Sequence, residues 1–424
     1  MQRILSTELS AHAGAEVTLA GWVHRRRLLR TVAFLILRDR AGLAQVVVTD
    51  PDTRARLEKL PEETAVSVTA TVVANADAPG GFELADPTVT ALSPGAEPVP
   101  VDLFRPRLSA SLPVTLDAAP VTLRHPARRA AARLAAAAAG GFRSVLDGLG
   151  FTEVHTPKLV AAATESGANL FEVDYFGRPA YLAQSPQFYK QTLVGVFERV
   201  YEVGPVFRAE PHDTARHLAQ YTSLDAELGF VRDHRDVMAV LRDVINAMVD
   251  AVAARPAEVA LSAADVPSVP ETIPEIHFAE ALALVVAPDD EPDLAPAHER
   301  ALGEWAVAEH GSDFLFVTGY PMRKRPFYTH PSPDPAYSNS FDLLFRGVEL
   351  VTGGQRLHRY DDYVAALAGQ PLEPYRWYLD AFRFGMPPHG GFAIGLERFV
   401  ARLVGAANVR EVTLFPRDLH RLTP

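Results

Sequence analysis

Residues 343–356, LLFRGVELVTGGQR, and residues 395–398, GLER, are the most informative stretches of this sequence. The first places Glu349 and Thr352 three residues apart with an arginine four positions further on, and the second ends in Arg398. Carboxylate and hydroxyl oxygens suit Mg²⁺, and arginines neutralise anionic substrate groups, as nucleotide activation requires. Taken alone, Glu349 and Thr352 could lie on a solvated helix face and Arg398 on the surface. The upstream segments decide between these interpretations.

A second segment begins at residues 207–210, FRAE, and ends at residues 221–227, YTSLDAE. Side chains two apart on a strand point to the same face, so Arg208 and Glu210 are expected on a strand, lining one pocket. The polar stretch between the two ends carries Arg216 and His217 as mobile positive charge. These residue types again predict a pocket for an anionic ligand.

Three segments in this order resemble the motifs of class II aminoacyl-tRNA synthetases. Motif 1 corresponds to residues 128–157, a predicted long helix followed by a strand that closes on Pro157. Motif 2 corresponds to about residues 200–227, and motif 3 to about residues 391–404. Any one motif is weak evidence, whereas three in the correct order are strong evidence.

Residues 184–191, QSPQFYKQ, and residues 353–358, GGQRLH, resemble the signatures of aspartyl-tRNA synthetases. A buried carboxylate needs partners, and the guanidinium of Arg356 with the ammonium of Lys190 would provide them. Asparagine would leave those buried cations unpaired, which gives discrimination of roughly 10⁴ or more. Because the related asparaginyl enzymes lack this lysine, Lys190 is the residue that would select aspartate. The alternative is an ordinary helix N-terminus with Lys190 in solvent.

The resemblance also implies roles for individual residues. Arg208 and Arg398 would be catalytic, acting on the α-phosphate and on the outer phosphates of ATP, and Glu349 and Thr352 would bind the Mg²⁺ cofactor. The predicted ATP-binding residues are Arg208, Glu210, Arg216, His217, Tyr221, Glu349 and Arg398. The predicted aspartate-binding residues are Glu165, Ser185, Gln187, Lys190 and Arg356.

Residues 164–168, TESGA, resemble the loop that closes over the amino acid in this family, and Glu165 would meet the substrate ammonium. Asp225 is a weaker candidate for the same group, and an interior structural acid is an equal alternative. The implied reaction has two steps. Aspartate first attacks the α-phosphorus of ATP, and a ribose hydroxyl of the terminal adenosine of tRNA then attacks the adenylate.

The composition excludes several classes of protein. The chain has 424 residues, 48% of them hydrophobic, which is enough for two domains with a large core. The absence of cysteine excludes disulfides, cysteine-ligated zinc and cysteine nucleophiles. A net charge of -11 means that a nucleic acid must meet local positive patches. The sequence suggests no membrane span or secretion signal, so we expect a cytoplasmic enzyme.

Residues 1–93 contain short runs of alternating apolar and polar residues, which predict a small barrel. The barrel resembles the anticodon-binding OB-fold of the aspartyl, asparaginyl and lysyl subclass, class IIb. By that resemblance Phe34 would stack on a base and Gln45 would read a base edge, although Phe34 also fits an ordinary buried strand. The densest basic cluster, residues 24–30, is expected to contact tRNA, and a solvated face is the alternative. The predicted anticodon-binding residues are His24, Arg27, Phe34, Gln45 and Pro79.

The overall prediction is an α+β protein in three parts. Residues 1–93 form the OB-fold barrel, the proline-rich residues 94–126 form a hinge, and residues 127–424 form a catalytic domain on an antiparallel sheet flanked by helices. No GxGxxG or GK[ST] loop occurs, so side chains must hold ATP. The span from motif 2 to motif 3 is too short for the extra domain of bacterial aspartyl enzymes, so the chain resembles the short archaeal type.

Archaeal-type enzymes that accept both tRNA(Asp) and tRNA(Asn) resemble this chain at His24 and Pro79, which predicts a non-discriminating enzyme. The family resemblance also implies a homodimer through the motif 1 helix and the strand around Pro157, with ATP and L-aspartate as substrates. A strictly tRNA(Asp)-specific enzyme is the alternative. Two other classes are an ammonia-dependent asparagine synthetase, which lacks an anticodon domain, and a non-catalytic RNA-binding paralogue. Retention of Arg208, Glu349 and Arg398 argues against the paralogue.

Overall fold

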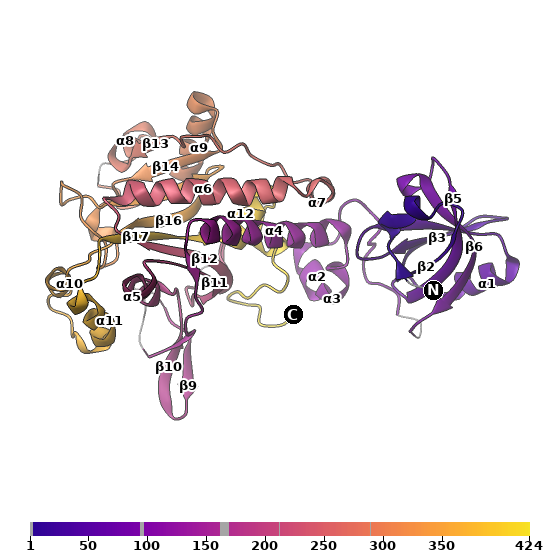
Figure 1. The fold of residues 1–424 in the computed structure, drawn as a ribbon, viewed down its shortest axis with the longest axis horizontal. Coiled ribbons are helices and arrows are strands. Elements are labelled where there is room, and N and C mark those ends of the chain that lie inside the picture. The colour runs from indigo at the N-terminus through magenta and orange to yellow at the C-terminus, as the bar shows by residue number, and fades with distance from the viewer. Residues whose placement is uncertain (1–2, 94–96, 162–168, 212, 289) are drawn as a thin grey trace. The chain divides into compact units, whose positions relative to one another are not determined.

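The computed structural model describes residues 3–93, 97–161, 169–211, 213–288 and 290–424, which form two compact units (Figure 1). The first unit comprises Met1–His125 and the second Pro126–Pro424. The predicted α+β class is confirmed, with a small barrel in the first unit and a largely antiparallel sheet flanked by helices in the second. In the part of the chain described, no helix is both long and apolar enough to cross a membrane.

The first unit is a closed barrel. Its strands pair in the order β1-β2-β3-β4-β6-β5, and β5 returns to pair with β2. Buried residues alternate with less buried ones along β5, so that one face of each strand fills the interior. The elements are β1 (Arg3–Ile4), η1 (Ser6–His12), β2 (Glu16–Leu28), β3 (Ala33–Arg38), β4 (Leu43–Val48), α1 (Pro51–Lys59), β5 (Ala65–Ala74), η2 (Pro79–Gly81) and β6 (Phe82–Ala91).

The predicted hinge contains regular structure. Two short helices, α2 (Leu112–Asp117) and α3 (Ala119–Thr122), lie within residues 94–126 and belong to the first unit. Proline stands in the first turn of each, where a missing N–H costs no hydrogen bond.

The second unit is built on an eight-stranded sheet in the part of the chain that the structure describes. Only its two edge pairs, β13 with β14 and β7 with β11, are parallel among the described strands. In sheet order the strands are β13 (Glu275–His277), β14 (Phe314–Thr318), β15 (Ser340–Phe345), β16 (Glu349–Gln355), β17 (His389–Gly395), β12 (Gln220–Gly229), β11 (Arg199–Phe207) and β7 (Thr152–Glu153).

Two long helices, α4 (Pro126–Gly148) and α6 (His234–Ala253), cover one face of this sheet (Figure 1). Both are amphipathic, and their buried side chains join those of the sheet in the main core. Gly141 allows the close approach of the two helices, because a Cβ there would collide with the carbonyl oxygen of Ala247. Because these helices cover one face of the sheet, the opposite face is the one available for a ligand site.

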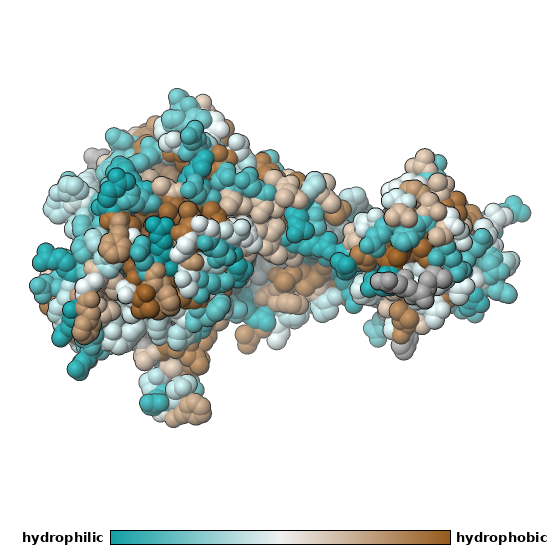
Figure 2. Space-filling model, viewed as in Figure 1, coloured by the Kyte–Doolittle hydropathy of each residue, from teal (hydrophilic) through white to brown (hydrophobic). Residues whose placement is uncertain are grey.

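Among the remaining elements, α7 and α12 pack with α4 on the helical face of the sheet. A small sheet, β8 with β10 and β9, includes a hairpin that projects from the second unit (Figure 1). Figure 2 shows hydrophilic and hydrophobic residues intermixed over the visible surface of this unit. These elements are β8 (Leu159–Val160), β9 (Glu172–Tyr175), β10 (Arg178–Leu182), α5 (Gln187–Phe197), α7 (Pro256–Ser262), α8 (Phe278–Leu284), α9 (Pro296–His310), η3 (Met322–Lys324), α10 (Tyr360–Ala366), η4 (Glu373–Tyr375), α11 (Arg376–Ala381), η5 (Phe382–Phe384), α12 (Leu396–Leu403) and η6 (Val409–Glu411).

Candidate active site

Cross-strand register places the polar residues of four strands on the open face of the sheet. Asp225 of β12 lies opposite Ala393 of β17, which lies opposite Thr352 of β16, which lies opposite Asp342 of β15. Directly paired residues share a face, so this row presents two acids and a hydroxyl on one side. Their sequence neighbours point to the helical core instead.

A β-bulge in β16 adds Glu349 to the same face. Glu349 pairs with Leu344 and Val351 pairs with Leu343, so Leu350 is an extra residue in this strand. Residues three apart on a regular strand point to opposite faces, but the inserted residue shifts the alternation by one. Glu349 and Thr352 therefore lie on the same face, as a shared role in metal binding requires.

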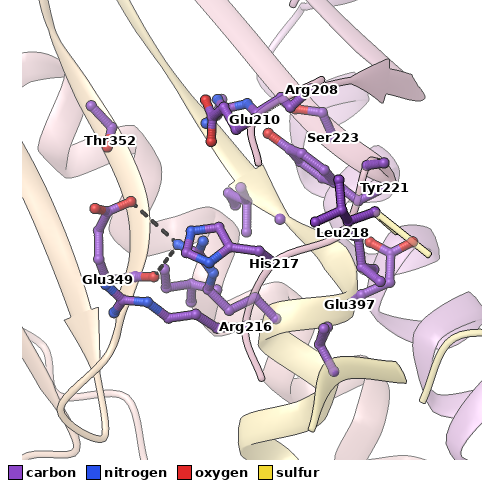
Figure 3. Close-up of a pocket in the computed structure, with 18 residues that line it drawn as sticks. Arg208, Glu210, Arg216, His217, Leu218, Tyr221, Ser223, Glu349, Thr352 and Glu397 are labelled. Atoms are coloured by element: carbon purple, nitrogen blue, oxygen red, sulfur yellow. Dashed lines mark hydrogen bonds and ion pairs between the residues drawn. The ribbon is translucent and has the colours of Figure 1, made fainter. Parts of the chain in front are cut away.

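One cavity gathers all the residues predicted to bind ATP and Mg²⁺ (Figure 3). Figure 3 shows labelled residues that approach it from β16, from β12 and from the segment that precedes β12, and Arg398 comes from α12. The predicted residues that line it are Arg208, Glu210, Arg216, His217, Tyr221, Glu349, Thr352 and Arg398. Segments nearly two hundred positions apart in sequence thus form one site.

The expectation of a strand at Arg208 and Glu210 was wrong. β11 ends at Phe207. The described residues between 208 and 219, which are all of them except residue 212, contain no helix or strand. The main-chain N–H of Arg208 still donates to Ala219 O at 2.8 Å, so the two segments diverge only beyond this pair. Both side chains reach the cavity from this irregular segment. The guanidinium of Arg208 lies 5.6 Å from the ring centre of Tyr221.

Arg398 and Glu349, which both line the cavity, are joined to each other. Nη1 of Arg398 donates to the carbonyl oxygen of Glu349 at 2.6 Å and lies 3.3 Å from Oε1 of its carboxylate. Burial raises the pKa of Glu349, but nearby guanidinium groups, first that of Arg398, outweigh this and hold the pKa below its usual value. The carboxylate is therefore ionised and available to a cation at neutral pH.

A buried cluster of two cations and two acids adjoins this cavity. Nζ of Lys190 lies 3.1 Å from Oδ1 of Asp225 and 3.3 Å from Oε2 of Glu227, and it donates to Phe392 O. Nε of Arg356 donates to Oε1 of Glu227 at 3.0 Å. Burial raises the pKa of Glu227, but the charges of Arg356 and Lys190 lower it by more, so the pKa lies below its usual value and the carboxylate stays ionised. The four formal charges cancel, which is what a buried ionic cluster requires.

Polar atoms without partners point to a missing ligand in this region. Both side-chain polar atoms of Gln184 and Nε2 of Gln187 are buried without a hydrogen bond. Oε2 of Glu227 also accepts no hydrogen bond, but it pairs with the Lys190 ammonium at 3.3 Å. Buried polar atoms are normally satisfied, so such a group calls for a ligand or water. Ser185 instead accepts the Gln187 N–H at 3.2 Å, at the start of α5. Glu165 lies outside the described residues.

Three of the residues predicted to read the anticodon belong to one face of the barrel. Arg27 pairs with Phe34, and Gln45 pairs with Ile36 two residues along the same strand, so all three side chains share that face. Phe34 is partly exposed rather than part of the core, and Nε2 of Gln45 donates to Glu83 at 3.0 Å. Pro79 is exposed in a separate turn.

His24 differs from the expectation of a surface contact. It is the extra residue of a β-bulge in β2, and it is 3% exposed. Its Nδ1 accepts a hydrogen bond from Arg38, which also pairs with the buried carboxylate of Glu63 at 2.6 Å. A ring enclosed in this way cannot touch a nucleic acid directly in this structure. Any influence of His24 on RNA binding must act through its neighbours.

Comparison with known families agrees with this geometry. Residues 112–419 match the family described as tRNA synthetases class II (D, K and N), and residues 17–92 match the OB-fold nucleic acid binding domain. The chain belongs to the class II tRNA synthetases. Among curated class II synthetases, the Aspartate--tRNA(Asp/Asn) ligase of Thermus thermophilus is 48% identical, with 100% of both chains covered. That of Methanopyrus kandleri is 42% identical over 97% of this chain and 96% of the relative.

Solved class II synthetases have the same fold over the full chain. The asparaginyl-tRNA synthetase from Pyrococcus horikoshii, complexed with asparaginyl-adenylate, has a TM-score of 0.92 and 31% identity, with 100% of both chains covered. A structure from Leishmania major described as a putative aspartyl-tRNA synthetase has a TM-score of 0.90 and 28% identity, covering 100% of this chain and 95% of that chain.

Sequence reasoning about this class II synthetase missed Asp342. Its side chain is buried, shares a face with Glu349 and Thr352, and lies 3.2 Å from the Arg325 guanidinium. Burial raises its pKa to about 6, against the opposing charge of Arg325, and the Glu349 carboxylate adds to the rise. Two acids that disfavour each other's charge are suited to sharing a cation. The sequence does show polar residues alternating with apolar ones on β15. That one of them lies beside Thr352 follows only from the register between β15 and β16.

Proposed function

We propose that this enzyme attaches L-aspartate to tRNA(Asp) and to tRNA(Asn), using ATP and an aspartyl-adenylate intermediate. The buried cluster of Lys190, Arg356, Asp225 and Glu227 beside the nucleotide cavity carries the proposal. Within the described ranges, Arg356 donates through Nε to Glu227 and through Nη2 to Gly391 O, so its other N–H groups can take a substrate carboxylate. The names of the curated relatives give independent support, because they specify aspartate and both tRNAs.

The likeness to an asparaginyl enzyme makes asparagine the second candidate substrate. A neutral amide would place an NH₂ donor against Arg356 and Lys190, where a carboxylate would present an acceptor to both cations. The Lys190 ammonium lies 3.1 Å from Asp225 and is 2% exposed, so its charge acts within a poorly solvated pocket. Electrostatics therefore favour the substrate that brings a second carboxylate.

The first step follows from the arrangement of cations around the cavity. The α-carboxylate of aspartate attacks the α-phosphorus of ATP, and the bond to the pyrophosphate oxygen breaks, leaving aspartyl-adenylate. Arg208 would neutralise the α-phosphate, and Arg216, His217 and Arg398 would hold the outer phosphates. Glu210 and Tyr221 would hold the adenine. In the second step a ribose hydroxyl attacks the adenylate carbonyl and AMP leaves. Protein groups position and stabilise charge, and none forms a covalent bond.

The donor set around Glu349 fits Mg²⁺. Glu349, Thr352 and Asp342 offer two carboxylates and a hydroxyl from one face, and oxygen ligands of this kind suit a hard cation. Such an ion would supply positive charge to the phosphates as they separate. In the described part of the chain, no group of three or more His, Cys, Asp or Glu side chains is placed to hold a metal ion. An ion at Glu349, Thr352 and Asp342 would take its remaining oxygen ligands from the substrate.

We further propose that the barrel binds the anticodon and that the enzyme is a cytoplasmic homodimer formed through the motif 1 region, α4 to Pro157. The shared face of Arg27, Phe34 and Gln45 combines a cation, an aromatic ring and an amide, which suits an unpaired base. His24 would contribute indirectly, by fixing Arg38 and the bulge in β2.

ATP–pyrophosphate exchange tests the amino acid without any tRNA. Aspartate, asparagine and lysine are offered in parallel, each with ATP and Mg²⁺. We expect exchange with aspartate alone above background. Exchange with asparagine at a comparable rate would overturn the assignment of the pocket.

A further inference from the structure

Glu299 is a buried acid in a helix that the catalytic motifs do not include. It lies in α9, is 3% exposed, and shares the buried face of that helix with Leu302, Gly303 and Ala306. An ionised carboxylate on a buried helix face is costly unless it is paired and hydrogen-bonded. The groups that pair with the Glu299 carboxylate therefore indicate its role.

Those partners are two elements of the nucleotide cavity. Oε1 and Oε2 of Glu299 lie 3.0 and 2.9 Å from Nη1 of Arg216. Oε2 also accepts the main-chain N–H of Glu349 at 2.9 Å. Arg216 comes from an irregular segment, and Glu349 is the first residue of β16. One carboxylate thus connects the segment that carries a phosphate-binding cation to the strand that carries the metal-binding acid.

Helix α9 reaches this position through a contact between two glycines. A Cβ on Gly303 would lie 2.5 Å from Cα and N of Gly347, in the turn between β15 and β16. Gly347 has a φ of 68°, a conformation that favours glycine. The helix backbone therefore rests directly on the turn, and Glu299, one helical turn earlier, reaches the start of β16.

We propose that Glu299 is a positioning residue that holds Arg216 in place for the outer phosphates of ATP. The inference rests on the proposed function, in which this cavity binds ATP. Nη1 of Arg216 is engaged by Glu299, while Nε and Nη2 donate to no residue of the described ranges. A guanidinium held by one edge presents its remaining donors in a fixed orientation, so less side-chain freedom is lost when phosphate binds.

Glu299→Gln tests this role because it keeps the volume and one carbonyl oxygen but removes the charge. In ATP–pyrophosphate exchange we expect the KM for ATP to rise about tenfold. The kcat and the KM for aspartate should change less than about twofold. Glu304→Gln is the matched control, since Glu304 lies on the same helix, is exposed and does not contact Arg216. The control should leave all three parameters unchanged.

A double-mutant cycle separates positioning from a general structural effect. In an Arg216→Gln background, adding Glu299→Gln should change the KM for ATP by less than about twofold. An equal rise in both backgrounds would show that Glu299 acts independently of Arg216 and would overturn the proposal, as would an unchanged KM in the single variant.

If a variant is less stable than the parent enzyme, its affinity for ATP can be measured by calorimetric titration at a temperature well below its melting temperature. The affinities then allow the same comparison as the KM values for ATP. A parent enzyme that exchanges no pyrophosphate with any amino acid would instead overturn the proposed function. The two failures are therefore distinguishable.

Discussion

Replacing Lys190 with methionine should abolish aspartate activation. The substitution keeps an unbranched side chain but removes the ammonium that lies 3.1 Å from Asp225 and 3.3 Å from Glu227. The charge of the four-residue cluster then falls from zero to minus one before the substrate adds its own carboxylate. Breaking a buried pair costs about 3 kcal/mol or more, so we expect kcat/KM for aspartate to fall by roughly a hundredfold or more.

The assay is ATP–pyrophosphate exchange over a range of aspartate concentrations, with the melting temperature measured alongside. Lys190→Met with Asp225→Asn restores charge balance, so this double variant should regain stability but not aspartate exchange. Lys158→Met is a control for loss of a lysine, because Lys158 pairs with Glu202 at 2.9 Å outside the cluster. Near-normal exchange by Lys190→Met would refute the reasoning, as would recovery of exchange in the double variant.

Three further predictions concern the barrel and the assembly. Phe34→Ala should raise the KM for tRNA about tenfold and leave pyrophosphate exchange unchanged, because base stacking contributes about 1–3 kcal/mol. Burial raises the pKa of Glu63, but His24, Arg38 and Arg124 lower it overall to about 2. Its stabilising contribution of roughly 3 kcal/mol is therefore complete above about pH 4.5 and lost as the pH falls towards 2. Fluorescence of Trp22, with the other tryptophans replaced by phenylalanine, should report this loss of stability as the pH falls. Glu63→Gln should make the stability nearly independent of pH over the same range. Light scattering at micromolar concentration should give a dimer, and a monomer would contradict the proposed interface.

Much of the cavity proposed to bind ATP could be predicted from sequence because its residues belong to short, locally patterned segments. Arg208, Glu210 and Arg216 lie in the segment that joins β11 to β12, and Tyr221 lies near the start of β12, so the pairing of these two strands brings all four to one end of the hairpin. The motif 1 helix was expected at residues 128–149 and spans Pro126–Gly148, since its apolar periodicity is long and uninterrupted.

The rest depended on pairings that no local pattern contains. The bulge at Leu350 decides which residues of β16 face the cavity, and the register between β15 and β16 brings Asp342 beside Thr352. Glu299 meets Arg216 across 83 positions of sequence. His24 was predicted to contact the anticodon, but Arg38 and Glu63 enclose it. Each of these contacts is set by tertiary packing.

Parallel aminoacylation of purified tRNA(Asp) and tRNA(Asn) transcripts with labelled aspartate tests the central claim most directly. The enzyme should charge both, with kcat/KM values within about tenfold of each other, or about 1.4 kcal/mol. A preference for tRNA(Asp) above roughly a hundredfold, about 2.7 kcal/mol of discrimination, would contradict a dual specificity. Failure to charge either tRNA would contradict the proposed function as a whole.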